Sequence, residues 1–306
     1  MKIENLQTNG LFLAPMAGVT DFAFRSLARE FGADFSYTEM ISAKALCYEN
    51  KKTLELLHTL PEETPVGIQI FGHEPEAFVK ALKMQELSKF DLIDINMGCP
   101  APKIVKNGDG SALMKDFKTA ENVLKTCVKY AQRPVTVKMR LGFDKDVSLD
   151  FAKMLSDNGA SAICVHGRLR EDFYSGTANL DAIAKVVASV PTRIIGNGDV
   201  FDEASYKNML ATGVNGVMIG RGALGKPQIF SEIKGEKVKF NKFEIIEKHI
   251  SLLRQFYSEE FLSAYMKKHL LWYLKEEKGA SGVKIAICKE TDLNKCLQLM
   301  KDFLQK

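Results

Sequence analysis

Short apolar segments alternate with amphipathic ones along the first two thirds of this chain, and this alternation constrains the fold more than any other feature. The intervening stretches repeat their apolar residues with helical spacing, for example at 21–31, 75–87, 120–130, 149–158 and 203–211. Gly32, Gly159 and Gly213 follow three of them, where a left-handed helix cap is favoured. We expect strands at 11–14, 35–37, 66–70, 92–95, 135–139, 162–166, 193–196 and 216–219.

The number of expected strands predicts a closed α/β fold. Strand–helix alternation implies parallel strands joined by right-handed crossovers. Eight such units close into a (β/α)8 TIM barrel, and 306 residues is the size of one barrel with an appendage. A doubly wound open sheet has the same alternation, so it stays open as an alternative.

The strand pattern ends after residue 219. Apolar residues then recur three and four apart at 243–257, 261–275 and 292–304, which is typical of helices. The change falls within a polar segment at 230–242. We therefore predict a TIM-barrel catalytic domain at residues 1–235 and a small all-helical domain at 242–306.

The charge of the chain is concentrated in this tail. Residues 1–231 carry 27 basic and 27 acidic residues, whereas residues 232–306 carry 15 and 11, so the tail holds the whole net charge of +4. Two explanations stay open: lysines that keep exposed helices soluble, or a surface for a polyanionic partner. Within the tail we expect Leu270, Leu271 and Leu274 to face the core and Lys267 and Lys268 to be free for solvent or phosphate.

The composition excludes several classes of protein. A hydrophobic share of 46% provides for a large core and excludes a disordered chain. No run approaches the ~18 apolar residues of a membrane span, and no apolar stretch follows the first lysine as in a secretory signal. The six cysteines form no metal-ligand spacing. We expect a cytoplasmic protein with reduced thiols, no membrane contact, no metal site, and no protein partner that the sequence reveals.

Polar residues lie at or just past the C-terminal ends of six of the predicted strands. The active site of a TIM barrel lies at the C-terminal ends of its strands. Each of these residues alone has an ordinary structural explanation, whereas six together predict a polar ring that binds a ligand. They are Gln69, Asn96, Lys138, His166, Asn197 and Arg221.

The loops after the last two strands form the common phosphate site of such barrels. Gly198, Gly220 and Gly222 allow backbone N–H groups to approach phosphate oxygens, and Arg221 supplies charge. The segment 220–225 also matches the dinucleotide fingerprint, but the further strands and the ribose-binding acid of a Rossmann unit are missing. A cofactor with a single phosphate group fits better than a dinucleotide.

Lys138 permits three interpretations. It could form a Schiff base as in some aldolases, neutralise carboxylates at the barrel mouth, or stabilise the anionic reduced form of a flavin. Gln69 and Asn96 carry both donors and acceptors and suit the polar edge of a flavin pyrimidine ring. An aldolase has no obvious need for these two amides.

Cys99 lies in a Gly-Cys-Pro turn just past the fourth predicted strand, at the expected catalytic face. A thiol with an ordinary pKa near ~8.5 is mostly protonated at neutral pH and can act as a general acid. A nucleophilic role would need a base, for which His166 is a distant candidate. By contrast, Cys127 and Cys164 lie within a predicted helix and strand and are expected to be buried.

Six motifs in the barrel resemble those of the tRNA-dihydrouridine synthases, most closely the bacterial B type. KHLLWYL at 268–274 is similar to the helical tail of that family. The resemblance implies an enzyme that binds FMN and uses NADPH to reduce the C5–C6 double bond of a uridine in tRNA to dihydrouridine. The six motifs are LAPMAGVTD at 13–21, DINMGCP at 94–100, VKMRLG at 137–142, VHGR at 165–168, GNGD at 196–199 and MIGRGALGKP at 218–227.

The resemblance also implies roles for individual residues. Cys99 matches the catalytic acid, which protonates C5 while flavin N5 gives hydride to C6. Asn96, Arg140 and Arg168 match positions near the substrate uridine. The residues that match the FMN site are Pro15, Met16, Ala17, Gln69, Lys138, His166, Asn197, Gly198, Asp199, Gly220 and Arg221.

Three other functions stay open at this point. One is a small-molecule FMN oxidoreductase resembling dihydroorotate dehydrogenase, but a small substrate needs no basic helical tail. The second is a lysine-dependent aldolase, which would be colourless. The third is a non-catalytic RNA-binding protein on a barrel scaffold, which leaves the polar ring unexplained.

Overall fold

The computed structural model describes residues 1–236 and 238–305 of the chain. All eight expected strands are present, and three of them run three or more residues past their expected ends. These extensions include polar residues such as Arg140 and Arg168, which an apolar pattern does not capture. The strands are β3 (Leu11–Leu13), β4 (Phe35–Ser42), β5 (Val66–Phe71), β6 (Leu92–Met97), β7 (Val135–Gly142), β8 (Ala162–Leu169), β9 (Arg193–Asn197) and β10 (Gly216–Ile219).

These strands form a closed parallel barrel in the order β10-β3-β4-β5-β6-β7-β8-β9. Closure is made by β10, which pairs with both β9 and β3. This pairing confirms the predicted TIM barrel and excludes the doubly wound open sheet. A short antiparallel hairpin, β1 (Lys2–Ile3) and β2 (Leu6–Gln7), precedes the barrel and was not expected, because two-residue strands are too short to show an alternating pattern.

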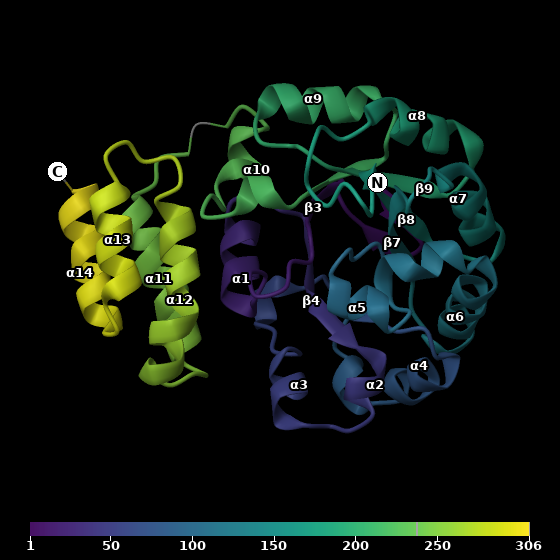
Figure 1. Ribbon diagram of the computed structural model, residues 1–306, viewed down its shortest axis with the longest axis horizontal. Coiled ribbons are helices and arrows are strands. Elements are labelled where there is room, and N and C mark those ends of the chain that lie inside the picture. Colours follow the sequence, from purple (N-terminus) through teal and green to yellow (C-terminus); the bar gives the residue numbers. More distant parts are fainter. Residues whose placement is uncertain (237, 306) are drawn as a thin grey trace.

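Helices surround the barrel on its outside (Figure 1). The five helices expected from the apolar spacing are all present as α1, α4, α6, α7 and α9, although α4 ends at Leu82 where the chain turns into a 3-10 segment. Gly32, Gly159 and Gly213 have φ angles of +96°, +90° and +84°, which confirms the left-handed caps. The helices around the barrel are α1 (Phe22–Glu30), α2 (Ala43–Leu46), α3 (Lys51–Glu55), α4 (Pro75–Leu82), α5 (Pro102–Lys106), α6 (Phe117–Tyr130), α7 (Ser148–Asp157), α8 (Leu180–Ser189), α9 (Glu203–Ala211) and α10 (Ile229–Glu232).

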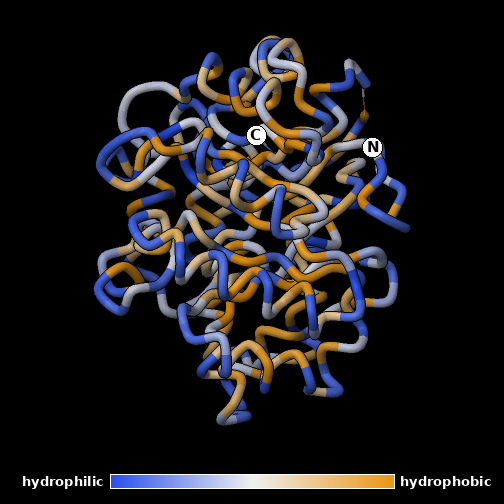
Figure 2. The backbone as a smooth tube through the Cα atoms, turned by 90° about the vertical axis from the view of Figure 1, so that its right-hand side faces the viewer, coloured by the Kyte–Doolittle hydropathy of each residue, from blue (hydrophilic) through white to orange (hydrophobic). Residues whose placement is uncertain are grey.

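The interior of the barrel is filled at its N-terminal end and open at its C-terminal end. Phe12, Phe35 and Tyr37 at the starts of β3 and β4 are fully buried, with ring centroids 5.1–6.5 Å apart. Apolar stretches run through the middle of the molecule, while hydrophilic stretches are concentrated in the outer turns (Figure 2). A ligand can therefore enter only from the end where the predicted polar ring lies.

The C-terminal region is a separate group of helices, which we call the helical module: α11 (Lys242–Arg254), α12 (Glu259–Tyr273), α13 (Ser281–Lys289) and α14 (Leu293–Leu304). The module has its own apolar core, and Phe22, Ala23 and Leu27 of α1 belong to the same cluster. It therefore packs against the barrel through α1 (Figure 1). Helix α13 was not expected from the sequence. No helix among the described residues is long and apolar enough to span a membrane.

The expected orientation of α12 is confirmed only in part. Leu270 and Leu274 are fully buried, but Leu271 is half-buried and lies outside the core. Lys267 and Lys268 are also half-buried: Lys267 Nζ donates to the carbonyl of Cys288 at 3.3 Å, and Lys268 Nζ lies 4.3 Å from the centre of the Tyr265 ring. The expectation that both lysines are free was wrong because α13 and the barrel pack against this face of α12.

Candidate active site

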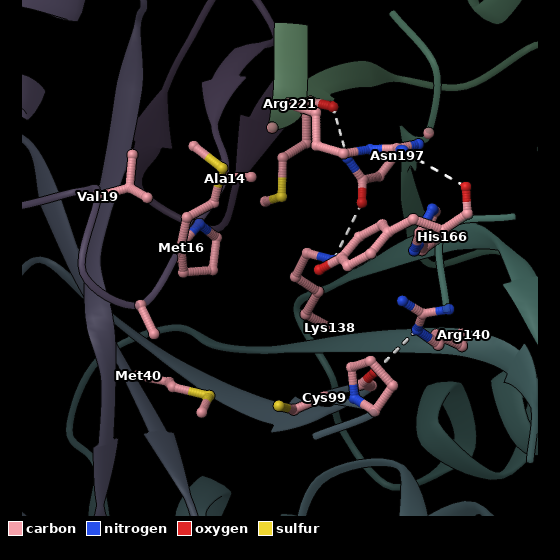
Figure 3. A pocket seen from close by; sticks show the side chains of 18 of the residues that line it. Ala14, Met16, Val19, Met40, Cys99, Lys138, Arg140, His166, Asn197 and Arg221 are labelled. Atoms are coloured by element: carbon pink, nitrogen blue, oxygen red, sulfur yellow. Dashed lines mark hydrogen bonds between the residues drawn. The ribbon is translucent and has the colours of Figure 1, made fainter. Parts of the chain in front are cut away.

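A cavity of about 650 Å³ opens at the C-terminal ends of the barrel strands. This volume is within the range of cofactor and small-molecule sites. Figure 3 shows Lys138, His166 and Asn197 along one side and Met16 and Met40 facing them. The cavity is lined by all but one of the predicted site residues: Pro15, Met16, Ala17, Gln69, Asn96, Cys99, Lys138, Arg140, His166, Asn197, Gly198, Asp199, Gly220 and Arg221.

A chain of hydrogen bonds holds the two amides of the ring in place. Asn96 Nδ2 donates to Gln69 Oε1 at 2.8 Å, and Gln69 Nε2 donates to Asp94 Oδ2 at 2.7 Å. Thr136 Oγ1 donates to the other oxygen of Asp94 at 2.6 Å. Because Gln69 and Asn96 each have a fixed partner, their remaining donors and acceptors present a defined edge to the cavity.

Asp94 is a buried residue that holds Gln69 in place, and the pattern of polar strand ends did not reveal it. It lies two residues before Asn96 in β6 and is 1% exposed. Burial raises its pKa to about 6, against the lowering effect of the hydrogen bonds from Gln69 and Thr136. An acidic residue two positions from Asn96 in an otherwise apolar strand was the available signal, since residues i and i+2 face the same side of a sheet.

Cys99 lies in the loop after β6, half-buried, with its Sγ directed into the cavity (Figure 3). Its backbone N–H donates to Asn96 Oδ1 at 2.9 Å, so the same amide that faces the cavity also fixes the turn. Burial raises the pKa of the Cys99 thiol, against the lowering effects of the Ala101 amide, Arg140 and Lys138. The thiol is therefore protonated at neutral pH, the form that a general acid requires.

Lys138 is the central cation of the cavity. Its Nζ donates to Asn197 Oδ1 at 3.0 Å, and Asn197 Nδ2 donates in turn to the carbonyl of Met218 at 2.7 Å. Burial lowers the pKa of Lys138. Burial together with the charges of Lys138 and nearby arginines lowers the pKa of His166 well below its usual range, so that this imidazole is neutral.

Asp199 joins two arginines at the end of the cavity formed by the loops after β9 and β10. It accepts from Arg168 Nη1 and Nη2 at 2.9 and 2.6 Å and from Arg221 Nη2 at 2.6 Å. Gly198 has φ +126°, and a Cβ there would lie 2.7 Å from Ala178 Cβ, so the turn requires glycine. Arg221 also lies 4.7 Å from the centre of the Tyr174 ring. The result is a positively charged, tightly constrained end that suits a phosphate group.

The two other predicted arginines are largely occupied by the protein itself. Arg168 does not line the cavity: it is 2% exposed and lies behind Asp199. Arg140 is equally buried, and its guanidinium donates to the carbonyls of Gly98, Leu169 and Phe173 at 2.8–3.0 Å. Both arginines therefore fix the loops that frame the cavity, and contact with a substrate stays a prediction.

Further cavity residues come from segments without a strand-end signal. Met40 follows the bend in β4, and Phe173 and Tyr174 lie in the loop after β8. Trp272 comes from α12, so the helical module supplies part of the cavity wall. It is held close to the loop after β10, where Gly225 has φ +66° and an added Cβ would lie 2.2 Å from the Trp272 carbonyl carbon. No local sequence pattern reveals such a contact between distant segments.

Comparisons with known proteins agree with this site. The family model for dihydrouridine synthase (Dus) matches residues 12–306. The chain is 37% identical to "Probable tRNA-dihydrouridine synthase" of Rickettsia conorii, covering 89% of this chain and 87% of that one. It is 36% identical to "tRNA-dihydrouridine synthase B" of Vibrio cholerae, covering 92% of both chains. The structure of morphinone reductase in complex with tetrahydroNAD is similar in fold alone, with a TM-score of 0.55 at 9% identity over 79% of this chain and 91% of that one. The protein is therefore an enzyme of the dihydrouridine synthase family.

Proposed function

We propose that this protein is a tRNA-dihydrouridine synthase that reduces the C5–C6 double bond of a uridine in tRNA, with FMN as the bound cofactor and NADPH as the reductant. The observation that carries the proposal is the placement of a protonated cysteine thiol in the same cavity as a fixed set of lysine and amide groups. In a member of this family, such a set would supply the acid and the cofactor site that the reaction requires.

The cavity fits FMN by the chemistry of its donors. The amides of Gln69 and Asn96 would hold the polar edge of the flavin pyrimidine, and Lys138 would lie near the ring that becomes anionic on reduction. The constrained turn at Gly198 and the cation of Arg221 would hold the single phosphate group. The chemistry that FMN would supply here, once reduced by NADPH, is a hydride for C6 of the uracil.

Cys99 would then deliver the proton to C5 of the same ring. Its thiol is kept in the neutral form by burial, and the hydrogen bond between its backbone and Asn96 fixes the turn that carries it. Lys138, held by Asn197, would stabilise the anionic reduced form of the flavin. His166 is neutral among these cations, so we assign it a hydrogen-bonding role beside the cofactor and not that of a cation.

The helical module would bind the tRNA next to this cavity. Trp272 lines both the cavity and a shallow groove between α12 and α13. Lys275, Lys284 and Lys289 line the same groove, and none of them has an ion-pair partner in the part of the chain that the structure describes. Unpaired lysines are available for phosphates, and a target uridine must leave its stack to reach the cavity. We therefore assign catalysis to the barrel, residues 1–235, and tRNA binding to residues 242–306.

The visible absorption spectrum and a tRNA assay test this function together. The purified protein should be yellow, carry about one FMN per chain, and form dihydrouridine in bulk tRNA when NADPH is added. A colourless protein that cannot be reconstituted with FMN would overturn the proposal. A yellow protein that leaves tRNA unchanged but reduces a free pyrimidine would instead favour the small-molecule oxidoreductase.

A further inference from the structure

Three titratable residues meet outside the active site, where the helical module packs against the barrel. Asp21 is the N-cap of α1, His249 lies in α11 and His269 lies in α12. Their side chains are 8%, 0% and 1% exposed. One ligand atom from each of the three lies within 4.8 Å of the others. This cluster joins two elements of the module to the barrel.

Both imidazoles direct the same nitrogen towards the carboxylate. His249 Nε2 lies 3.4 Å from Asp21 Oδ1, and His269 Nε2 lies 3.8 Å from Asp21 Oδ2. Both Nε2 atoms are buried, and neither has a hydrogen-bond partner among the described residues. A buried polar nitrogen without a partner is unfavourable, so the space between these atoms calls for a ligand that both nitrogens can bind.

Two outer atoms of the cluster are already engaged. His249 Nδ1 lies 3.1 Å from Tyr273 Oη. Tyr265 Oη donates to Asp21 Oδ2 at 2.8 Å. Metal-binding histidines typically have the nitrogen that faces away from the ion held by a hydrogen bond, and metal-binding carboxylates are held in the same way.

We propose that Asp21, His249 and His269 bind a divalent transition-metal ion, with Zn²⁺ as the best match, that fastens the helical module to the barrel. Two imidazole nitrogens and one carboxylate oxygen are a common zinc ligand set, with water as the fourth ligand. Ligand atoms about 2.0–2.1 Å from a tetrahedral ion are ~3.3 Å apart. The separations of 3.4 and 3.8 Å run to the two different oxygens of Asp21, and one ligand atom from each residue lies within 4.8 Å of the others, so the three ligands need to close by at most about 1.5 Å to reach this spacing.

The ion would have a structural role and an accessible route. None of the three residues lines the active-site cavity. Asp21 and Tyr265 do line a separate cleft between the barrel and the module, which would admit the ion. Because the ligands come from α1, α11 and α12, the loss of the ion should loosen the attachment of the module and leave the interior of the barrel intact.

Metal analysis of the whole protein tests the proposal without any readout of activity or flavin. We expect about one zinc per chain after dialysis against Zn²⁺, a lower Tm after treatment with a chelator, and recovery of the Tm when Zn²⁺ is added back. X-ray absorption at the zinc edge should show imidazole ligands and no sulfur. His269→Ala and Asp21→Asn should lose the stoichiometric zinc, whereas His73→Ala, at an exposed histidine of the barrel, should retain it.

A milder variant covers the case in which His269→Ala does not fold. Tyr273→Phe keeps all three ligands and removes only the hydroxyl beside His249, so it should fold and bind Zn²⁺ about 10- to 100-fold more weakly. Wild-type protein that takes up no stoichiometric zinc, with a Tm that neither chelator nor Zn²⁺ changes, would overturn the proposal. The cluster would then be a buried Asp–His–His hydrogen-bonded group, and the proposed reaction on tRNA would be unaffected.

Discussion

Lys138 Nζ donates to Asn197 Oδ1 across strand β8, which lies between the strands that carry the two residues. Asn197 is itself fixed by its bond to the carbonyl of Met218 on the next strand. The position of the lysine is therefore set by the pairing of four consecutive barrel strands and not by a flexible loop. A cation held in this way needs no rearrangement when charge develops beside it.

Replacing this cation should weaken flavin binding. Lys138→Met keeps most of the side-chain volume and removes the charge, so we expect FMN to bind at least about tenfold more weakly. The measurement is FMN stoichiometry after gel filtration and the Kd on reconstitution. Lys153→Met, at an exposed position of α7, is the control. Unchanged FMN affinity in Lys138→Met would assign this lysine to the structure of the barrel mouth.

The variant Cys99→Ala distinguishes a role of Cys99 in proton donation from a role in flavin binding. The variant should bind FMN and accept electrons from NADPH at the wild-type rate, because Cys99 is not among the groups assigned to the flavin. Reduction of uridine in tRNA should fall about 10²- to 10⁴-fold, the usual contribution of a general acid. Stopped-flow flavin reduction and a dihydrouridine assay measure the two steps. Full turnover of tRNA by the variant would show that Cys99 only packs.

The raised pKa of Cys99 sets the pH dependence of this step. The acid is active while it is protonated, so activity should persist above the ordinary thiol pKa of ~8.5 and decline only at higher pH. The pH profile of kcat/KM for tRNA reports this limit. Cys99→Ser should lose the alkaline decline, since a serine hydroxyl does not titrate in this range. A decline centred below ~8.5 would contradict the assignment.

The raised pKa of Asp94 should make the folded state less stable as the pH rises. A salt-bridged carboxylate, whose pKa is lowered, has the opposite effect. The pKa of Asp94 is about 6 in the folded state, whereas the ordinary value is 3.8. Between these two pH values the folded protein therefore binds a proton that the unfolded chain has released. Stability should therefore fall as pH rises through this window and level off above about pH 6. Asp94→Asn removes this dependence. The free energy of unfolding of the variant minus that of the wild type should therefore increase by on the order of 3 kcal/mol as the pH rises from about 4 to above 6.

Urea unfolding at about pH 4 and about pH 7 tests the Asp94 prediction. The variant loses one acceptor for Gln69 or Thr136, and this cost is the same at both pH values, so only the change between them is informative. A difference between variant and wild type that is constant with pH would mean that Asp94 does not titrate in this window.

The groove lysines should govern the affinity for tRNA. Lys275→Glu combined with Lys289→Glu should raise the KM for tRNA and lower the salt slope of binding by about one unit for each phosphate that the protein no longer neutralises. NADPH oxidation by the flavin should continue as before. Lys153→Glu, an exposed position on the barrel helix α7, is the matched control. Wild-type affinity and salt slope in the double variant would show that the basic excess of the tail serves only solubility.

The strands and the residues at their ends could be predicted from sequence because both depend on local pattern and on one rule of barrel geometry. A buried parallel strand is apolar, and the residue that ends it points to the shared mouth, so Gln69, Lys138 and Asn197 were found without a structure. Asp94 was missed because it lies within β6, two residues before Asn96, and not at the end of the strand. The glycine positions likewise indicated the constrained turn at Gly198.

Contacts between distant segments could not be predicted in this way. Trp272 reaches the cavity, and Lys268 lies over the Tyr265 ring, only because α12 packs against the barrel. The proposed metal ligands Asp21, His249 and His269 have no common spacing in the sequence, so the sequence led us to expect no metal site. In each case the relevant relationship is set by tertiary packing, which apolar periodicity does not encode.

The close approach of Gly225 and Trp272 has a consequence for recombination between relatives. The linker between α10 and α11 is the natural point at which to exchange helical modules, since it joins the last barrel helix to the first helix of the module. An exchange there separates the two halves of one cavity wall: the loop that requires glycine stays with the barrel, and the tryptophan leaves with the module. Chimeras joined at this linker should be active only when the backbone of the incoming module, at the position of Trp272, fits the resident loop. The barrel and the helical module therefore have to be exchanged together if this cavity is to stay intact.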